Sequence, residues 1–464
     1  MNKIKFMKRY LKQAEKGDAL AQFKLGIIFM SGLDAPKDMS LAIEWFEKAA
    51  EQGVLEAQYN LAAIYMVGEG VDEDPSIGAK WFLMAAEQGD SRAQYYLGTL
   101  YLSGEGVDED IAMAIEWLEK SAGQGFAQAQ YRLGVLYYNG EGVDEDIALA
   151  IEWLEKAAEQ GHEQAQYRLG VFYYIGEGVA ENPITGVKWF RKAAEQGEPR
   201  AQYYLGILYR NGEVYDEDIT LAVKWFRKSA EQGLAQAQYR LGTFYLTGEG
   251  VSEDLDQAIE WFEKAAEQGL VLAQYALASI YMVDDGDSKN YSRAAKWLRK
   301  AAEQGHMMSQ FQLGVLYLTG KGVTMDKYVA AQWFLKGAEQ GHTESQFNLA
   351  CCYSRGEGVA MDNSMAARWY RSVAEQGDKV SQFNLGVFYL TGEGVDIDKS
   401  LAVKWFQRAA EQGHIEAQFL LGCAYHNGEG VDMDKDLAAQ WFQKAAEQGH
   451  KKAKEHILFI RPLS

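Results

Sequence analysis

The stretch GEGVDEDIALAIEWLEKAAEQG, residues 140–161, recurs in near copies along a chain of 464 residues. Tryptophan marks these copies, because the chain has twelve and they follow one another every 36 residues: Trp45, Trp81, Trp117, Trp153, Trp189, Trp225, Trp261, Trp297, Trp333, Trp369, Trp405 and Trp441. A fixed period of this length is typical of a repeat protein. We therefore expect one domain that grows by adding units, and not the roughly three separate domains that length alone would suggest.

Each unit is predicted to form two helices. In the first unit, residues 18–53, helix A covers about 18–31 and helix B about 39–52. Glycines such as Gly53 and Gly68 follow these helices and favour the left-handed conformation that ends a helix. Asp or Asn precedes helix B in every unit, where its side chain can accept first-turn N–H groups: Asp38, Asp74, Asp110, Asp146, Asn182, Asp218, Asp254, Asn290, Asp326, Asp362, Asp398 and Asp434.

Both helices carry one apolar stripe with helical spacing. In the first unit the stripe of helix B is formed by Ala42, Trp45, Phe46 and Ala49, and that of helix A by Ala21, Leu25, Ile28 and Phe29. The position after the helix A leucine is Gly in nine units and Ala in three, at Ala62, Ala278 and Ala350. Because glycine inside a helix costs roughly 1 kcal/mol relative to alanine, we expect close backbone approach at this position.

The pattern A-x-A-Q-Y-x-L-G-x-x-Y-x-x-G-E-G-V-x-x-D-x-x-x-A-x-x-W-F-x-K-A-A-E-Q-G, carried for instance by residues 163–197 and 235–269, resembles the Sel-one-like repeat (SLR), a branch of the tetratricopeptide-like solenoids. The resemblance implies an all-α fold, a right-handed superhelical α-solenoid of twelve helix-turn-helix repeats. We place these repeats at 18–53, 54–89, 90–125, 126–161, 162–197, 198–233, 234–269, 270–305, 306–341, 342–377, 378–413 and 414–449. Residues 1–17 and 450–464 are expected to form a capping helix at each end.

The resemblance also implies a function in protein binding. Members of the family are mostly adaptors that hold other proteins together, in bacterial signalling, secretion and host contact and in eukaryotic protein quality control. Two departures stand out. The cysteine-rich bacterial members carry a disulfide-linked pair in each unit, whereas Cys351, Cys352 and Cys423 do not follow the repeat. The loops at 283–290 and 212–218 also differ from the GEGV pattern, and we expect them to be either irregular or private contact points.

Columns that are identical in all units, such as the glutamine column from Gln22 to Gln418, are expected to serve the scaffold. Specificity is expected where units differ, which on helix A is one narrow face at i, i+4, i+7 and i+11. Its first two columns in units 3 to 7 read Arg92/Tyr96, Gln128/Arg132, Gln164/Arg168, Arg200/Tyr204 and Gln236/Arg240. Together with the next two columns, these twenty positions hold five arginines and no carboxylate.

We predict that this face lines the concave groove of the solenoid and binds a partner. Arginine binds carboxylates through two parallel hydrogen bonds, and Tyr and Arg often carry the energy of interfaces. The hypothesis is that units 3 to 7 hold an acidic or C-terminal segment of another protein. From unit 9 onward the second column holds Gln312, Asn348 and Asn384, whose amides could hold a peptide backbone. The alternative is that the arginines pair with solvent or with loop glutamates.

Composition excludes several other partners. The formal net charge is −20, which argues against nucleic acid or an anionic membrane surface, because both attract Lys- and Arg-rich proteins. The N-terminal residues lack the apolar core of a secretory signal, and no run of apolar residues approaches membrane-spanning length. We therefore expect a cytoplasmic protein, although export by another route stays open.

No cofactor or metal site is predicted. Acidic loops such as residues 143–146 lack the alternating ligands of an EF-hand. Five histidines share one column and are interpreted as residues that begin helix A, too far apart to share a metal: His162, His306, His342, His414 and His450.

We also expect no enzyme activity, because no nucleophile with a base, metal cluster or phosphate loop is evident, and GEGV joins two helices instead of a strand and a helix. The resemblance leaves one enzymatic alternative, since a few family members are described as penicillin-binding or weak β-lactamases. The cysteine framework of those members is missing here, and so is an export signal. RNA binding by helical repeats is a third possibility, which the charge disfavours. Nitrocefin hydrolysis and the salt dependence of partner capture would separate these alternatives.

Overall fold

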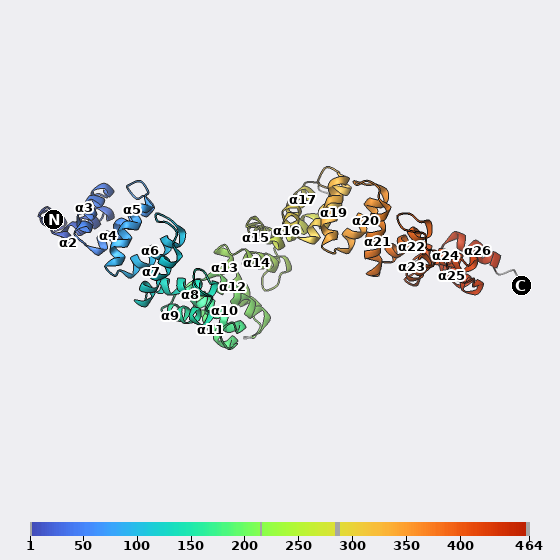
Figure 1. Ribbon diagram of the computed structural model, residues 1–464, viewed down its shortest axis with the longest axis horizontal. Coiled ribbons are helices and arrows are strands. Elements are labelled where there is room, and N and C mark those ends of the chain that lie inside the picture. Colours follow the sequence, from blue (N-terminus) through green and yellow to red (C-terminus); the bar gives the residue numbers. More distant parts are fainter. Residues whose placement is uncertain (1, 214–215, 284–287, 461–464) are drawn as a thin grey trace. The chain divides into compact units, whose positions relative to one another are not determined.

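The computed structural model describes residues 2–213, 216–283 and 288–460, which form 26 helices and no strand (Figure 1). Helices α1 (Asn2–Ala14) and α26 (Lys451–Ile460) lie where we predict the end caps. Between them, helices A and B alternate twelve times, which confirms the predicted all-α solenoid of helix pairs. The A helices are α2 (Ala19–Ser31), α4 (Leu55–Val67), α6 (Ser91–Ser103), α8 (Ala127–Asn139), α10 (Glu163–Ile175), α12 (Pro199–Asn211), α14 (Ala235–Thr247), α16 (Val271–Val283), α18 (Met307–Thr319), α20 (Thr343–Arg355), α22 (Lys379–Thr391) and α24 (Ile415–Asn427).

The B helices follow the A helices in each repeat. They are α3 (Met39–Glu51), α5 (Pro75–Glu87), α7 (Ile111–Gly123), α9 (Ile147–Glu159), α11 (Pro183–Gln196), α13 (Ile219–Glu231), α15 (Leu255–Glu267), α17 (Ser288–Glu303), α19 (Lys327–Glu339), α21 (Asn363–Glu375), α23 (Lys399–Glu411) and α25 (Lys435–Glu447). The predicted caps form as expected in most repeats: Asp146, for example, accepts the N–H of Leu149 at 2.9 Å, and Gly68 ends α4 with a φ of 71°.

The predicted cap at Asn290 is wrong. Helix α17 begins at Ser288, so Asn290 lies in its first turn and not before it. Ser288 and Lys289 are neither Gly nor Pro, the residues that oppose helix most strongly, so the helix extends by about one turn. The two unusual loops lie partly outside the described residues, since 284–287 belong to the loop at 283–290, and 214 and 215 to the loop at 212–218.

Contacts within the chain divide it into two compact units. The first comprises Met1–Ala237 and Glu249–Val251, and the second comprises Gln238–Gly248 and Ser252–Ser464. Inside each unit the helices pack chiefly on their neighbours along the chain, as expected for a solenoid. Each core is a row of clusters shared by successive repeats, such as the cluster that runs from Ala14 to Ile64 in the first unit.

The centre of each repeat is the residue after the tryptophan and not the tryptophan itself. The largest fully buried side chains include six phenylalanines of this column: Phe46, Phe190, Phe226, Phe262, Phe334 and Phe442. Trp45 is half-buried, and the ammonium of Lys48 lies 4.4 Å from the centre of its ring, a cation–π contact. The tryptophans lie at the edge of the core, five of them 7–9% exposed and the others half-buried, while the neighbouring residue fills its centre.

The glycine of helix A makes room for this phenylalanine. A Cβ placed on Gly170 would lie 2.5 Å from Cδ1 of Phe190, and one on Gly26 would lie equally close to Phe46. The close approach that we predicted between two backbones is therefore chiefly an approach of an aromatic ring to one backbone. Alanine at this position would need the ring to shift, which explains why most repeats accept the helix propensity cost of glycine.

The glutamine column forms a ladder that links consecutive helices. The buried Gln166 of α10 donates to the carbonyl of Ala158 at the end of α9, at 3.0 Å. Its own Oε1 accepts a hydrogen bond from Gln196 at the end of α11, at 2.7 Å. The bond between the two glutamines recurs in all twelve repeats. The structural role that we predicted for this column is thereby confirmed.

Candidate protein-binding surface

The predicted binding residues stand on the solvent side of the A helices. In the first unit, α6, α8, α10 and α12 carry eight of them, and none is buried: Arg92, Tyr96, Gln128, Arg132, Gln164, Arg168, Arg200 and Tyr204. Gln236 belongs to the same unit, whereas Arg240, Gln312, Asn348 and Asn384 belong to the second. The geometry below is given for each unit by itself.

Two of the arginines have acidic partners at the helix caps, so for these two the alternative of pairing with nearby carboxylates holds. Arg92 Nη2 lies 2.6 Å from Asp90 Oδ2, and Arg200 Nε lies 2.8 Å from Glu198 Oε1. Asp90 and Glu198 precede their helices and also accept the N–H of Ala93 and Ala201. The helix face itself carries no carboxylate in these repeats, and both acidic residues lie just before the helix. An acidic residue two positions before an arginine at a helix start is the signal that could have revealed both pairs.

Repeats 3 and 6 build the same aromatic arrangement around these arginines. The guanidinium of Arg92 lies 4.3 Å from the ring centre of Tyr59, and Tyr96 stacks on Phe82 with ring centres 5.3 Å apart. In repeat 6 the guanidinium of Arg200 lies 4.6 Å from the ring centre of Tyr167. Burial, followed by the influence of Tyr204, raises the pKa of Tyr167 to about 12. Each arginine is therefore held in place by a carboxylate and an aromatic ring.

The face also brings together residues that lie two repeats apart. Burial lowers the pKa of Arg200, but its hydrogen bond to Glu198 and the charges of Glu198, Tyr167 and Tyr131 raise it, so that the net shift is upward. Tyr131 stands on α8 and Arg200 on α12, with α10 between them in the chain. Tyr131 of repeat 4 thus lies within electrostatic reach of Arg200 of repeat 6.

Arg132 and Arg168, in repeats 4 and 5, differ from their neighbours. Among the residues that the structure describes, neither has an ion pair, and the buried Nε of each has no hydrogen-bond acceptor. Arg168 only approaches the ring of Tyr138, at 5.8 Å from its centre. Guanidinium offers five N–H donors and no acceptor, and a buried donor without a partner is costly. Each guanidinium therefore keeps an unpaired donor inside the protein, and that a ligand supplies acceptors to its other N–H groups stays a prediction.

The polar column of the second unit has fewer side-chain donors and acceptors available to a partner than the arginines of the first unit. Gln312 donates to the hydroxyl of Tyr275 at 3.3 Å, which leaves its buried Oε1 without a donor among the described residues. Asn348 donates to the carbonyl of Glu344 in its own helix at 2.8 Å, so this donor is already used. Asn384 is half-buried. That these amides hold a peptide backbone stays a prediction.

The histidine column forms helix caps, as predicted. His162 accepts the N–H of Ala165 through Nδ1 at 3.3 Å and stacks on Tyr131, with ring centres 4.5 Å apart. Burial lowers the pKa of His162, which keeps the ring neutral and able to accept. Within residues 2–213, 216–283 and 288–460 there is no group of three or more His, Cys, Asp or Glu side chains that could hold a metal. Nor is any helix there both long and apolar enough to cross a membrane.

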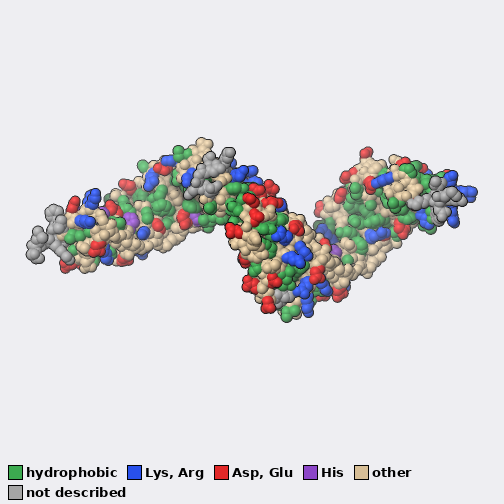
Figure 2. All heavy atoms as spheres, turned by 180° about the vertical axis from the view of Figure 1, so that it is seen from behind, with side chains coloured by type: hydrophobic (Ala, Val, Ile, Leu, Met, Phe, Trp, Pro, Cys, Tyr) green, Lys and Arg blue, Asp and Glu red, His purple; other side chains and the backbone are tan. Residues whose placement is uncertain are grey.

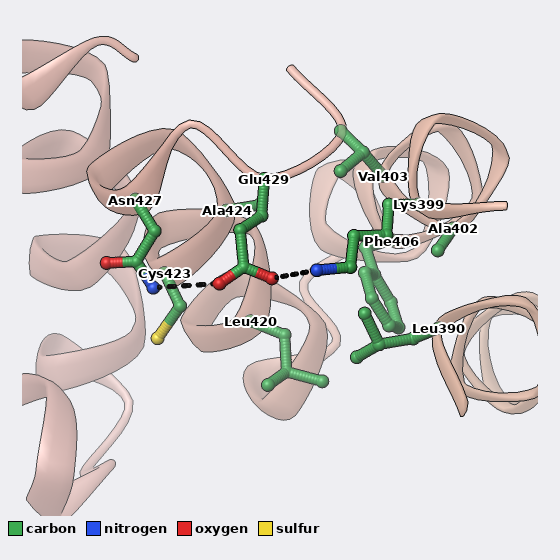
Figure 3. A pocket seen from close by; sticks show the side chains of 10 residues that line it. All are labelled: Leu390, Lys399, Ala402, Val403, Phe406, Leu420, Cys423, Ala424, Asn427 and Glu429. Carbon is green, nitrogen blue, oxygen red and sulfur yellow. Dashed lines mark hydrogen bonds and ion pairs between the residues drawn. The ribbon is translucent and has the colours of Figure 1, made fainter. Parts of the chain in front are cut away.

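A small cavity of about 80 Å³ lies in the second unit between α22, α23 and α24 (Figure 3). Leu390, Val403, Phe406 and Leu420 give it apolar walls, and at its edge Glu429 accepts hydrogen bonds from Lys399 and Asn427. The cavity arises at Ala424, because the other eleven repeats have a larger side chain in this column: Ile28, Ile64, Leu100, Leu136, Phe172, Leu208, Phe244, Ile280, Leu316, Cys352 and Phe388. Burial raises the pKa of the adjacent Cys423 thiol, which disfavours the reactive thiolate.

We expect Ala424→Leu to raise the free energy of unfolding by about 1 kcal/mol, because it fills this cavity with the side chain that other repeats use. Chemical denaturation followed by far-UV circular dichroism measures the change. Ala417→Leu is the matched control, since Ala417 is fully buried and its column holds only Ala or Ser. Overpacking there should destabilise by about 1–3 kcal/mol. Destabilisation by both variants would show that the cavity is not available for filling.

Comparison with known protein families finds the same twelve repeats. The family model described as "Sel1 repeat" matches twelve consecutive segments, at residues 19–54, 55–90, 91–126, 127–162, 163–198, 199–234, 235–270, 271–306, 308–342, 343–378, 379–414 and 415–450. Most of these segments begin one residue after the repeat boundaries that we predict. No curated protein matches the chain.

Solved structures similar to this chain include the following two. The chain is 34% identical to c5321, a protective antigen present in uropathogenic Escherichia coli strains that displays an SLR fold, over 98% of this chain and 90% of that one, with a TM-score of 0.57. It is also 34% identical to a Sel1 repeat protein from Oxalobacter formigenes, over 67% of this chain and 91% of that one, with a TM-score of 0.47. The resemblance drawn from the sequence is confirmed, and the chain belongs to the Sel1 repeat family.

Proposed function

We propose that this chain is a protein-interaction scaffold without catalytic activity, and that its first unit binds an acidic or C-terminal segment of a partner on the A helices of repeats 3 to 6. Sel1 repeat proteins generally serve as scaffolds for protein interactions, and the family is generally non-catalytic. Localisation in the cytoplasm is part of the same proposal.

The observation that carries the proposal is the difference between the two kinds of arginine. Arg92 and Arg200 are neutralised by Asp90 and Glu198, and we assign them to the edges of the surface. Arg132 and Arg168, in the two repeats between, have buried donors without acceptors. A carboxylate that accepts two N–H groups of one guanidinium forms charge-assisted hydrogen bonds. These contribute more to the binding free energy than neutral hydrogen bonds do, because the acceptor is ionised.

The flanking aromatic rings support a peptide as the occupant. Tyr96 is exposed and Tyr204 half-buried, and each stacks on a phenylalanine of the preceding helix B. A tyrosine held in this way loses little conformational entropy on binding, and Tyr and Arg are the residue types that dominate binding hot spots. Exposed Gln128 and Gln164, one helical turn before the two arginines without ion pairs, add amide groups that can pair with a peptide backbone.

The double variant Arg132→Glu/Arg168→Glu tests the proposal. The probe is a fluorescein-labelled oligoglutamate peptide with a free C-terminus, and binding is followed by fluorescence anisotropy at low and physiological ionic strength. We expect the affinity to fall by at least about tenfold, equivalent to about 1.4 kcal/mol, because attraction is replaced by repulsion. An amidated copy of the peptide separates recognition of the terminal carboxylate from recognition of the side chains.

Lys188→Glu/Lys224→Glu is the matched control. Both lysines are exposed on helix B, and the same column holds glutamate in repeats 1, 3, 4 and 7, at Glu44, Glu116, Glu152 and Glu260, so the scaffold tolerates the change. This variant alters the net charge equally and should keep its affinity within about twofold. If the arginine variant keeps an unaltered circular dichroism spectrum and still binds the peptide as the wild type does, the A-helix surface is not the binding site.

A further inference from the structure

One column of the connecting loops changes character after the eighth repeat, within the second unit. The residue before the helix B cap is charged in the first seven repeats: Lys37, Glu73, Glu109, Glu145, Glu181, Glu217 and Glu253. The aligned residue of repeat 8, Lys289, is also charged but lies within α17. In the last four repeats the same position holds Met325, Met361, Ile397 and Met433. We name these four residues the methionine row. They are 60%, 68%, 64% and 60% exposed, so water covers most of each side chain.

The scaffold does not need apolar residues at this position. Met361 and Glu73 both lie against the glycine that ends helix A of their repeat, Gly356 and Gly68 respectively, which shows that the local geometry is the same in both units. Both are exposed. Single exposed apolar residues are ordinary, but several in register form a patch of the kind that marks an interaction site. Because the fold tolerates either residue type, the change points to binding.

The loops that carry the methionine row are stacked directly on one another. Gly358 and Gly430, with φ of 76° and 74°, have no room for a Cβ because the carbonyls of Lys327 and Lys399 in the preceding repeat lie against them. Lys327 and Lys399 also reach Glu357 and Glu429 of the next loop, at 3.4 and 2.9 Å. The four apolar side chains therefore follow one continuous edge of the second unit.

An open hollow of about 570 Å³ adjoins this edge between repeats 9 and 10. Tyr328, Tyr353, Val359 and Met361 line it, and Tyr328 is itself 63% exposed. On the face displayed in Figure 2, hydrophobic side chains likewise reach the surface between acidic and basic ones. The hollow is shallow and open, and it extends the apolar surface of the methionine row.

The net charge of the loops around the methionine row indicates which kind of partner can bind there. The four loops, residues 320–328, 356–364, 392–400 and 428–436, hold ten carboxylates against four lysines, a net charge of −6. Lys327 and Lys399 already pair with Glu357 and Glu429, so the remaining excess is acidic. A partner that covers the row must match apolar side chains and carboxylates together. Flexible methionine side chains suit such contacts because they adapt to differently shaped partners.

We propose that the methionine row binds a basic amphipathic segment of another protein, whose apolar side chains cover Met325, Met361, Ile397 and Met433 while its lysines or arginines meet the surrounding carboxylates. This surface lies on the loops of the second unit and is independent of the arginine surface of the first. The two surfaces favour partners of opposite charge, so the chain would join a basic segment to an acidic one.

The test uses the full chain and a fluorescein-labelled amphipathic helical peptide of leucine and lysine, followed by fluorescence anisotropy. Replacing all four residues of the row by glutamine removes the apolar surface and leaves the net charge unchanged. We expect this variant to bind at least about tenfold more weakly. Replacing the four by leucine should retain binding, because the apolar area is kept.

The matched control replaces Glu73, Glu109, Glu145 and Glu181 by glutamine, which removes four charges from the same column of the first unit. It should bind the peptide as the wild type does. Loss of binding in the control together with retention in the glutamine variant of the row would assign the affinity to unspecific attraction and overturn the proposal. Failure of the wild type to bind would overturn it as well. So would a wild-type dimer in light scattering that the row variant does not form, since a second copy would then cover the row.

Discussion

Phe190→Ala is expected to lower the free energy of unfolding by about 3–5 kcal/mol, the range for removing a large aromatic side chain from a core. Phe190 is 1% exposed. Its ring fills the space that Gly170 leaves open and stacks on Tyr204, with ring centres 5.2 Å apart. The substitution therefore removes apolar burial, leaves a cavity and frees Tyr204 at once.

The measurement must resolve single repeats, because a solenoid can unfold in parts and a two-state fit is then unjustified. Hydrogen exchange resolved by peptide should show loss of protection in α10, α11 and α12 and little change in α22 to α24. Trp189→Ala is the control, since Trp189 is only half-buried and should cost clearly less. A larger effect at Trp189 than at Phe190 would contradict the assignment of the repeat centre.

Gln166→Leu is expected to cost about 2 kcal/mol, although leucine has nearly the volume of glutamine. The substitution removes the donor to the Ala158 carbonyl and the acceptor for Gln196. The Ala158 carbonyl keeps the backbone N–H of Gly161 at 3.0 Å but loses its side-chain donor, and Gln196 loses its acceptor. Two hydrogen bonds are therefore lost, each of which contributes about 1 kcal/mol. The link from α9 through α10 to α11 is broken at this repeat.

Gln164→Leu is the matched control for the ladder. Gln164 lies two residues earlier on the same helix and is exposed, so its replacement should change stability by less than about 0.5 kcal/mol. Thermal unfolding and peptide-resolved exchange of both variants give the comparison. Equal effects at Gln164 and Gln166 would mean that the ladder contributes no more than helix propensity does.

Most of the fold follows from the sequence by local rules. The Asp and Gly residues that flank each helix act within a few positions of the chain, so their spacing predicts the boundaries, and the structure agrees at Asp146 and Gly68. The exception at Asn290 arises where the loop sequence departs from the repeat. Repetition adds a second source of information, because a residue kept in every unit, such as the ladder glutamine, must serve every unit.

The sequence by itself thus determined the helix pairs, their number, the family and the columns in which function could reside. Tertiary structure decided which members of those columns have partners within the chain. Arg92 and Arg132 lie on the same predicted face, but the carboxylate that neutralises Arg92 is only two residues away in the sequence. For Arg132, the packing of neighbouring helices decides that Nε is buried without an acceptor. Met361 becomes part of a surface only because successive loops stack on one another. The reason is physical: periodicity fixes which face of a helix a residue occupies, whereas its partners come from helices and loops of neighbouring repeats that only folding brings near.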